Sequence, residues 1–442
     1  MTHYSAPQKR TSWGRVARPL LPVATPQFAD ELPAIVAERP GEPTLAVGLC
    51  RSYGDSVVNS SGGVIDMTHL DRIVAFDRDR GVITAEAGAS LSEILSLTVP
   101  NGWFTRTTPG TRFVTLGGAV ANDVHGKNHH SAGTFGCGVT EIELMRSDGT
   151  VHRLSADDGD PLFAATVGGL GLTGVIRTVT LDLAPIRSAY LDVERIAFGH
   201  VRDFFAVAAE SERSHEHTVA WIDCAGGRSH RGRGIFQRGN WSEGGGLDLH
   251  DDHKTLTMPL NAPGFALNGL TVRLFNTVYF RLQKYGLARQ RLHYAPFFYP
   301  LDVVLHWNRL YGRCGFYQYQ CVIGHSEAPQ AIEDLLDRIA ASGAGSFLAV
   351  LKALGPKPSL GMLSFPREGV TLALDFPNKG TKTLKLLGEL DAIVRAANGR
   401  LYPAKDGRMP AAMFQAGYPN VDAFMPYVDP AFGSDFWRRV SA

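Results

Sequence analysis

The chain has 442 residues, of which 44% are apolar and 20% charged, and its formal net charge is +1. Domains usually have about 100–200 residues, so the length predicts two domains, or one domain with a large insertion. A net charge near zero creates no field that attracts nucleic acid, so we expect no nucleic-acid partner. No window approaches 18 uninterrupted apolar residues, so we expect no transmembrane helix.

The N-terminus and the cysteines indicate the compartment. Basic residues precede a Pro-broken apolar run at 19–23 that is too short for a signal peptide. The cysteines are odd in number and form no C-x-x-C pair, which argues against a disulfide framework or a zinc ribbon. We therefore expect reduced, mostly buried thiols and a cytoplasmic protein, or a peripheral one at the inner membrane. The five are Cys50, Cys137, Cys224, Cys314 and Cys321.

In chain order, the first elements are short. Residues 44–66 predict a strand, a Gly-rich turn and a second strand, and 71–87 predict a hairpin that turns at 79–81. Ser90 is placed to cap a helix that ends at 100–102, and another helix begins near Pro161. The alternating run at 175–183 predicts a strand.

After about residue 187, strands and helices alternate without Gly-rich turns. Helices are expected at 328–342 and 381–397, and strands at 345–351 and 369–376. We predict an α+β fold with a nucleotide-binding domain over 1–187 and a substrate domain over 188–399, built on an antiparallel sheet with helices. The segment 400–442 is expected to return to the first domain.

One motif suggests a dinucleotide site and is misleading. Residues Gly169–Gly174 satisfy G-x-G-x-x-G, but a Rossmann turn requires a strand before the glycines and a helix after them. Here a helical run precedes and a strand follows. A tight turn from helix to strand is the simpler interpretation.

Two other Gly-rich segments are more informative. Residues 108–136 hold six glycines among small and hydroxyl side chains, and 48–55 (GLCRSYGD) has the same character. Such segments can bring many backbone N–H groups against a pyrophosphate and a flavin ring without a basic patch. One such turn would usually be structural, whereas two together favour a ligand.

The histidines of the second segment could suggest a metal. His125 and His129 have i, i+4 spacing, but Gly126 and Lys127 stand where a zinc helix has an acid and a helix former. We predict no metal site. A histidine near a flavin and a structural histidine remain equal alternatives on this pattern alone.

Together these segments resemble the PCMH-type FAD-linked oxidases, the family of vanillyl-alcohol oxidase and the sugar-lactone and alditol oxidases. The motifs are GLCRSYGD (48–55), residues 110–136, GGLGLTGVI (168–176), FYQYQ (316–320) and YPAKD (402–406). Because HGKNHHSAG, QYQ and YPAKD occur at matching distances, the chain is most similar to the oxidase subunits of decaprenylphosphoryl-β-D-ribose 2′-epimerases. The resemblance runs from about Trp13 to the C-terminal tail, and GGLGLTGVI alone indicates only an FAD domain.

The resemblance implies FAD as cofactor, a two-part PCMH-type FAD-binding domain, and a set of site residues. The residues implied to be catalytic are Lys405, His125 and Lys127. Those implied to bind the sugar and its phosphate are Tyr53, Tyr299, Gln318 and Gln320, with Thr371 at an altered position. Those implied to bind FAD are Gly48, Arg51, Ser52, Tyr53, Gly54, Gly110, Thr111, Thr115, Gly117, Gly118, Asn122, His125, Gly126, Ala132, Gly133, Gly171, Gly174, Ile176 and Tyr402.

The chemistry of these residue types fits oxidation of an alcohol. Hydride transfer requires an acceptor for the hydroxyl proton, and a lysine desolvated beside a flavin can serve as that base or remain charged and stabilise the alkoxide. The pattern leaves these two roles of Lys405 open. Glutamine and tyrosine suit a sugar because they offer donors and acceptors without a fixed charge. Outside the YPAKD context, Lys405 would be an ordinary turn lysine.

Two departures from the family matter. Many members attach FAD through a histidine in the first Gly-rich loop, where this chain has Arg51 and Ser52, so we expect non-covalent FAD. The mycobacterial relatives carry Asn-x-Cys where this chain has Thr371, Leu372 and Ala373. These changed side chains can alter which substrate is bound, but they do not change the type of reaction that we expect.

Residues 254–301 contain no acid but six basic and many aromatic side chains. On a helix over 270–285, Arg273, Thr277, Arg281 and Lys284 share one face, and Leu274, Phe275, Val278, Tyr279 and Leu282 share the opposite one. This pattern is typical of an interfacial helix or lid, and a core-packed helix is the alternative. The loop 227–234 (GRSHRGRG) could face phosphates, although a solvated loop is the simpler interpretation.

The sequence thus leaves three hypotheses. The first is a polyprenyl-phosphoryl-ribose 2-oxidase whose keto product is reduced by a separate short-chain NAD-dependent reductase for cell-envelope arabinan. The second is a soluble D-arabinono-1,4-lactone or alditol oxidase of the same fold. The third is a flavin-free lipid- or nucleic-acid-binding protein that uses 254–301. Bound flavin would eliminate the third.

Overall fold

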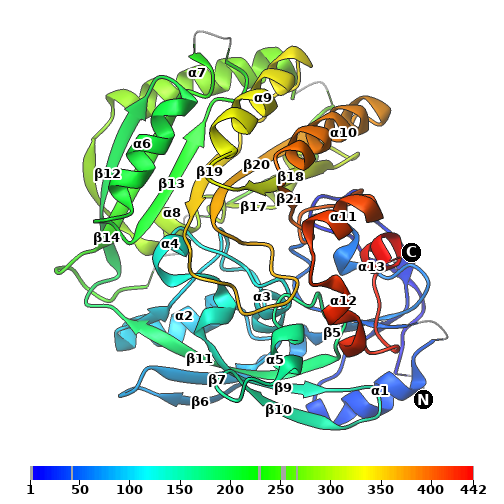
Figure 1. The fold of residues 1–442 in the computed structure, drawn as a ribbon. Coiled ribbons are helices and arrows are strands. Elements are labelled where there is room, and N and C mark those ends of the chain that lie inside the picture. Colours follow the sequence, from blue (N-terminus) through cyan, green and yellow to red (C-terminus); the bar gives the residue numbers. More distant parts are fainter. Residues whose placement is uncertain (1–2, 41–42, 227–229, 250–254, 265–266, 442) are drawn as a thin grey trace.

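The computed structural model describes residues 3–40, 43–226, 230–249, 255–264 and 267–441. Two large sheets face each other across the middle of the molecule, and the shorter elements lie around them (Figure 1). Both sheets consist of antiparallel pairs. The fold is therefore α+β, as predicted.

The first large sheet belongs to the N-terminal half. Its strand order is β10-β9-β11-β7-β6, and β8 pairs with the far end of β11. The strands are β6 (Ile73–Asp77), β7 (Val82–Glu86), β8 (Trp103–Thr105), β9 (Val139–Met145), β10 (Val151–Ser155) and β11 (Val175–Pro185). A small parallel sheet lies beside it, with β3 (Val23–Ala24), β4 (Leu45–Val47) and β5 (Val64–Asp66).

Local signals set the short helices of this half. Ser90 accepts a hydrogen bond from the backbone of Glu93 and caps α2 (Leu91–Thr98), as predicted. Thr115 caps α3 (Leu116–Ala121), whose Leu116, Ala119 and Val120 pack in the core between α3 and the sheet. The predicted helix at Pro161 is α5 (Pro161–Thr166).

The predicted hairpin is β6 and β7, and its turn uses Gly81 at φ +67°. The G-x-G-x-x-G segment joins α5 to β11, so it is the helix-to-strand turn that the order of elements favoured. Gly171 and Gly174 adopt φ +75° and +144°, which explains the glycines without a Rossmann unit.

The second large sheet has eight strands in the order β16-β12-β14-β13-β19-β20-β18-β21. These are β12 (Tyr190–Phe198), β13 (His217–Ile222), β14 (Gly234–Trp241), β16 (Arg289–His293), β18 (Phe316–Ile323), β19 (Ala349–Leu354), β20 (Gly369–Pro377) and β21 (Arg400–Leu401). The strand predicted at 345–351 begins later, because Ser346 and Leu348 form a local hydrogen-bonded turn before β19.

Helices cover the outer face of this sheet. They are α6 (Val201–Ser211), α9 (Ala328–Ala341) and α10 (Thr381–Ala396), seen at the top of Figure 1. Alternate residues of the strands, such as Tyr319, Cys321 and Leu372, join these helices in the largest hydrophobic core. Their neighbours in sequence therefore point inward, toward the first sheet.

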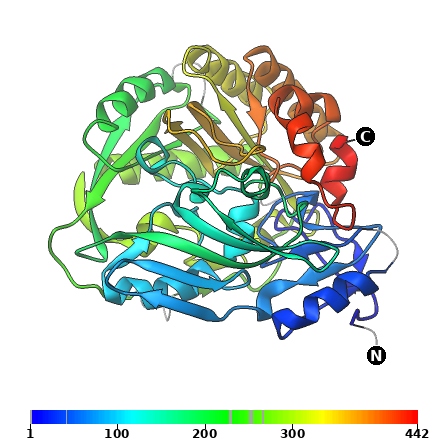
Figure 2. The same ribbon diagram turned by 60° about the horizontal axis from the view of Figure 1, so that its bottom comes forward.

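The C-terminal segment contacts both halves (Figure 2). Phe436 of α13 (Asp435–Ser441) packs in the core of the second sheet, whereas Phe432 packs beside the small parallel sheet. Arg439 forms an ion pair with Asp55 of the first Gly-rich loop at 2.7 Å. The remaining C-terminal helices are α11 (Ala411–Gly417) and α12 (Val421–Phe424).

Three further expectations can be compared with the structure. All five cysteines are unpaired, but only Cys224 and Cys321 are buried, so the expectation of mostly buried thiols was wrong. No helix in the described part of the chain is long and apolar enough to cross a bilayer. Arg231 and Arg233 of the Arg-rich loop pair with acids, as a structural loop would, while 227–229 lie outside the described residues.

Candidate active site

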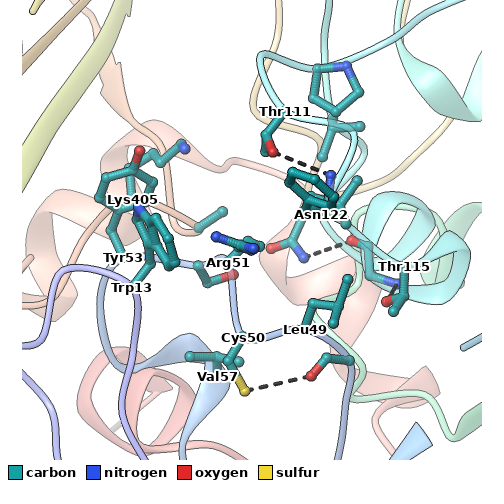
Figure 3. Close-up of a pocket in the computed structure, with 18 of the residues that line it drawn as sticks. Trp13, Leu49, Cys50, Arg51, Tyr53, Val57, Thr111, Thr115, Asn122 and Lys405 are labelled. Atoms are coloured by element: carbon teal, nitrogen blue, oxygen red, sulfur yellow. Dashed lines mark hydrogen bonds between the residues drawn. The ribbon is translucent and has the colours of Figure 1, made fainter. Parts of the chain in front are cut away.

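A cavity of about 390 Å³ lies between the two sheets. The first Gly-rich loop, residues 109–118 and 121–125, and the turn before β11 line one side. The inward side chains of the second sheet and the YPAKD loop line the other, together with residues 301–307. In Figure 3, Trp13, Tyr53 and Lys405 gather on one side, Thr111, Thr115 and Asn122 on the other, and Arg51 lies between them.

The first loop has unsatisfied donors that suit an anionic cofactor. In the described part of the chain, the backbone N–H groups of residues 49–52 have no hydrogen-bond partner. The buried Nε of Arg51 also lacks one, although its guanidinium stacks 4.0 Å from the Trp13 ring. Unpaired donors along a cavity wall, one of them buried, fit a ligand with phosphate oxygens. The residues present therefore fit FAD.

Close packing brings the two Gly-rich segments together. A Cβ on Gly48 would lie 2.1 Å from the Thr115 Oγ, and a Cβ on Gly117 would lie 2.9 Å from the Ala87 Cβ. Gly48 thus allows the loop after β4 to lie against Thr115 at the start of α3, and Gly117 allows α3 to lie against Ala87, which follows β7.

Most residues predicted to bind the cofactor line the cavity. These are Gly48, Arg51, Ser52, Tyr53, Gly110, Thr111, Thr115, Gly117, Gly118, Asn122, His125, Gly171, Gly174, Ile176 and Tyr402. Gly54, Gly126, Ala132 and Gly133 lie behind the cavity wall. Gly54 packs against the backbone of Asp406, and Gly133 lies beside Cys137 and Lys357.

The second sheet contributes inward polar side chains by strand alternation. Gln318 and Gln320 of β18 line the cavity, whereas Tyr319 between them joins the outer core. The side-chain amide of Gln320 donates a hydrogen bond to the hydroxyl of Thr371 on β20 at 3.2 Å. Thr371 does not itself line the cavity, so its role is to hold Gln320 in place. Lys352 of β19 also lines the cavity.

Lys405 follows β21 and reaches the cavity beside the first loop. Its ammonium lies 3.9 Å from the centre of the Tyr53 ring, a cation–π contact. The backbone N–H of Tyr53 donates to the carbonyl of Ala404 at 2.8 Å, which joins the two loops. Burial lowers the pKa of Lys405 to about 7, although the carboxylate of Asp375 opposes that shift. At neutral pH this amine can therefore accept a proton.

His125 is held from both ring nitrogens. The Lys352 side-chain nitrogen lies 3.1 Å from Nδ1, and the side-chain amide nitrogen of Gln320 lies 3.0 Å from Nε2. Burial, and then the charge of Lys352, lower the pKa of His125 well below its usual value. The imidazole is thus neutral, and each of its ring nitrogens has a protein partner.

Lys127 and Tyr299 do not reach the cavity. The Lys127 ammonium lies 4.3 Å from the Phe297 ring and donates to the carbonyl of the same residue. The Tyr299 hydroxyl is buried and bonded to Thr108 at 2.6 Å. Lys127 therefore anchors the second Gly-rich segment to α8 (Tyr294–Phe298).

No cluster of three potential metal ligands occurs in the part of the chain that the structure describes. His129 is buried, and burial lowers its pKa to about 4. It does not line the cavity.

The sequence interpretation missed Lys352, Trp13 and Trp307, which all line the cavity. Lys352 had a usable signal, because it is the single charged residue in the apolar strand AVLKAL. A lysine at an inward position of a buried strand is costly unless it has a partner or a function.

The comparisons with known proteins agree with this geometry. Residues 21–155 match the family model described as FAD binding domain. The chain is 36% identical to decaprenylphosphoryl-β-D-ribose oxidase of Mycolicibacterium smegmatis, across 99% of both chains. This chain belongs to the decaprenylphosphoryl-β-D-ribose oxidase family. It is an FAD-dependent oxidoreductase of the PCMH type, as predicted.

Other relatives match less of the chain. An uncharacterised protein of Streptomyces coelicolor is 33% identical over 79% of this chain. L-gulono-1,4-lactone dehydrogenase of Mycobacterium tuberculosis is 30% identical, but only over 37% of this chain and 38% of its own. Lactone-oxidising relatives therefore share part of the chain rather than all of it.

Family membership leaves the mode of FAD attachment as a prediction. Arg51 and Ser52 stand where a covalently attached flavin requires a histidine, and the orphaned donors of this loop suit reversible contacts. Acid precipitation of the purified protein is expected to release all flavin into the supernatant. Yellow colour that stays with the pellet would contradict non-covalent binding.

Proposed function

We propose that this enzyme oxidises the 2-hydroxyl of a polyprenyl-phosphoryl-β-D-ribose to the 2-keto sugar. A separate short-chain NAD-dependent reductase would then complete the epimerisation to the arabinose donor of a cell-envelope glycan. The observation that carries this proposal is the similarity over 99% of both chains to a decaprenylphosphoryl-β-D-ribose oxidase, which includes the sheet that lines the substrate side. Gln318 and Gln320 support this proposal, because their side-chain amides line the cavity and offer donors and acceptors to sugar hydroxyls.

The residues of the cavity have separate roles in this reaction. FAD, when bound, accepts the hydride from the carbinol carbon. The neutral amine of Lys405 takes the hydroxyl proton, and it is the side chain whose pKa of about 7 suits that step. The neutral His125 contacts both Lys352 and Gln320 and so holds these two polar side chains at the cavity wall.

A sugar-lactone oxidase is the alternative, and substrate choice separates the two. Under anaerobic conditions, a prenyl-phosphoryl-ribose should bleach the flavin, whereas free D-arabinono-1,4-lactone should not. Bleaching by the lactone alone would favour the alternative.

A polyprenyl substrate requires access to a membrane, and α7 (Gly269–Tyr285) supports such contact. The helix packs on the protein through Val272, Asn276 and Phe280, and Asn276 donates to the carboxylate of Asp223 at 2.9 Å. The apolar row that a core-packed helix would bury is instead exposed, at 77, 64, 48 and 67% for Leu270, Leu274, Val278 and Leu282.

Basic side chains border this row. Arg273, Arg281 and Lys284 are exposed, and no acid pairs with them among the described residues. Arg289 and Arg291, by contrast, pair with Glu194 and Asp192. Lys254 and Phe265 lie outside the described residues. We propose that α7 lies in the interface of an anionic membrane, with its leucines inserted and its cations at the headgroups.

Reversal of the three charges of α7 is expected to weaken binding to anionic vesicles. Each cation near such a surface contributes about 1 kcal/mol, so Arg273→Glu, Arg281→Glu and Lys284→Glu together should cost at least about 3 kcal/mol. Flavin content should not change, since α7 is remote from the cofactor loops. A matched triple reversal at Arg78, Arg80 and Lys385, which are exposed and, among the described residues, form no ion pair, controls for net charge. Equal vesicle binding by the α7 variant and the parent would refute this role.

A further inference from the structure

Asp375 is a buried carboxylate beside the active site for which the proposed reaction has given no role. It lies on the inward side of β20, directly opposite Gln318 of β18, and is 1% exposed. Gln318 donates to it at 2.7 Å and the Tyr311 hydroxyl at 3.3 Å. The backbone N–H of Asp375 donates to Ser346, which fixes the strand at this point. Both side-chain bonds are to neutral groups.

A buried carboxylate is costly unless an opposite charge compensates it. Among the described residues, the side-chain partners of Asp375 are Gln318 and Tyr311, and no arginine or lysine forms an ion pair with it, so a charge at longer range can stabilise it. Contacts connect Asp375 to Lys405, because Gln318 donates to Asp375 at 2.7 Å and is hydrogen-bonded to Tyr53, whose ring lies 3.9 Å from the Lys405 ammonium. Lys405 provides that charge, and each of the two groups favours the charged form of the other. Burial raises the pKa of Asp375 to about 7, against the opposing effects of Gln318, Lys405 and Tyr311.

The surroundings make this pairing specific. Lys352, the other lysine of the cavity, repels Lys405 and thus opposes its protonation. Asp302, an acid that does line the cavity, is bonded to Thr111 and to the backbone of Arg112. The ionisable groups that face Asp375 or Lys405 are Tyr53 from the first loop, Tyr311 from η8 (Trp307–Tyr311), Lys352 from β19 and His125 from the second Gly-rich segment.

We propose that Asp375 is the positioning residue for Lys405. The carboxylate of Asp375 stabilises the ammonium that forms when Lys405 takes the proton of the substrate hydroxyl. The inference rests on the proposed function for that step. The O–H bond of the substrate breaks, and its proton becomes the third proton of the lysine nitrogen. The carbon that bears this hydroxyl loses its hydrogen as a hydride to the flavin. Gln318 and Tyr311 hold the carboxylate without neutralising it, so its charge remains available to Lys405.

The test measures the basicity of Lys405 directly. Trace labelling with acetic anhydride from pH 5 to 10, followed by mass spectrometry of the Lys405 peptide, reports the fraction of free amine. Asp375→Asn keeps the shape and removes the charge, so the labelling midpoint should move down by roughly one pH unit. Tyr311→Phe removes one hydrogen bond to Asp375 but no charge, and it should leave the midpoint within a few tenths of the parent value.

The pH profile of flavin reduction should show the same shift in Asp375→Asn. Asp375→Glu, which restores a carboxylate, should return the midpoint toward that of the parent, and it serves if the Asn variant does not fold. An unchanged midpoint in Asp375→Asn, or a Glu variant that titrates like the Asn variant, overturns the inference. If the midpoint moves but prenyl-phosphoryl-ribose does not reduce the parent enzyme, the proposed function fails and the electrostatic pairing stands.

Discussion

Replacement of Lys405 with methionine is expected to abolish nearly all substrate-driven flavin reduction. Methionine keeps most of the volume of the side chain but removes the amine that accepts the hydroxyl proton. Loss of a positioned acid–base group typically costs about 100- to 10,000-fold in rate. Flavin binding should persist, since the unsatisfied donors of the first loop and the Gly-rich segment that packs on it do not involve this side chain.

Anaerobic stopped-flow bleaching measures this step apart from reoxidation. The parent rate should rise with pH through about 7 and then level off, because burial lowers the pKa of Lys405 to about 7 and the neutral amine is the active form. The Lys405→Met rate should lack that rise. Reduction of this variant within a few-fold of the parent would make Lys405 a binding residue, and His125 would become the leading candidate.

The second large effect is expected from Gly54→Ala. A Cβ on Gly54 would lie 1.5 Å from the carbonyl oxygen of Asp406, so the first loop and the YPAKD loop would have to separate. The second loop cannot yield easily, because the Asp406 carboxylate accepts from the backbone of Met409 and from Arg439. Overpacking against fixed backbone typically costs 1–3 kcal/mol, and we expect about 3 kcal/mol here.

Urea unfolding of the flavin-free protein measures this cost. Gly199→Ala is the matched control, because a Cβ there would meet no atom within 4 Å, and surface changes of this kind stay within about 0.5 kcal/mol. The surviving folded fraction of Gly54→Ala should also reduce its flavin slowly, since Lys405 is carried on the displaced loop. Identical unfolding midpoints for the two variants would show that the loops are not tightly packed.

Local chemistry made much of the fold predictable from the sequence. The cap at Ser90, the turn at Gly81 and the order of α5, glycines and β11 all follow from short-range rules, and the structure confirms them. Strand alternation also accounts for the paired inward positions of Gln318 and Gln320. The two Gly-rich segments indicated the cofactor because glycines among small and hydroxyl side chains allow backbone N–H groups to approach a pyrophosphate.

The rest depends on contacts between distant segments. Lys127 turns away from the cavity because the Phe297 carbonyl and ring receive its ammonium, and nothing near residue 127 in the sequence indicates that. The face of α7 that packs on the protein carries Asn276, which donates a hydrogen bond to Asp223. A helical pattern of apolar residues does not reveal such a polar contact. Lys352 and Asp375 act through partners that are distant in the sequence, so their roles emerge only in three dimensions.

The site of hydride loss tests the central claim most directly. A prenyl-phosphoryl-ribose with deuterium at C2 of the ribose should reduce the flavin more slowly than the unlabelled compound in a single anaerobic turnover. Its recovered keto product should have lost that deuterium, while deuterium placed at C3 should be retained. Retention of the C2 deuterium in a product formed with full bleaching would contradict oxidation at the 2-hydroxyl.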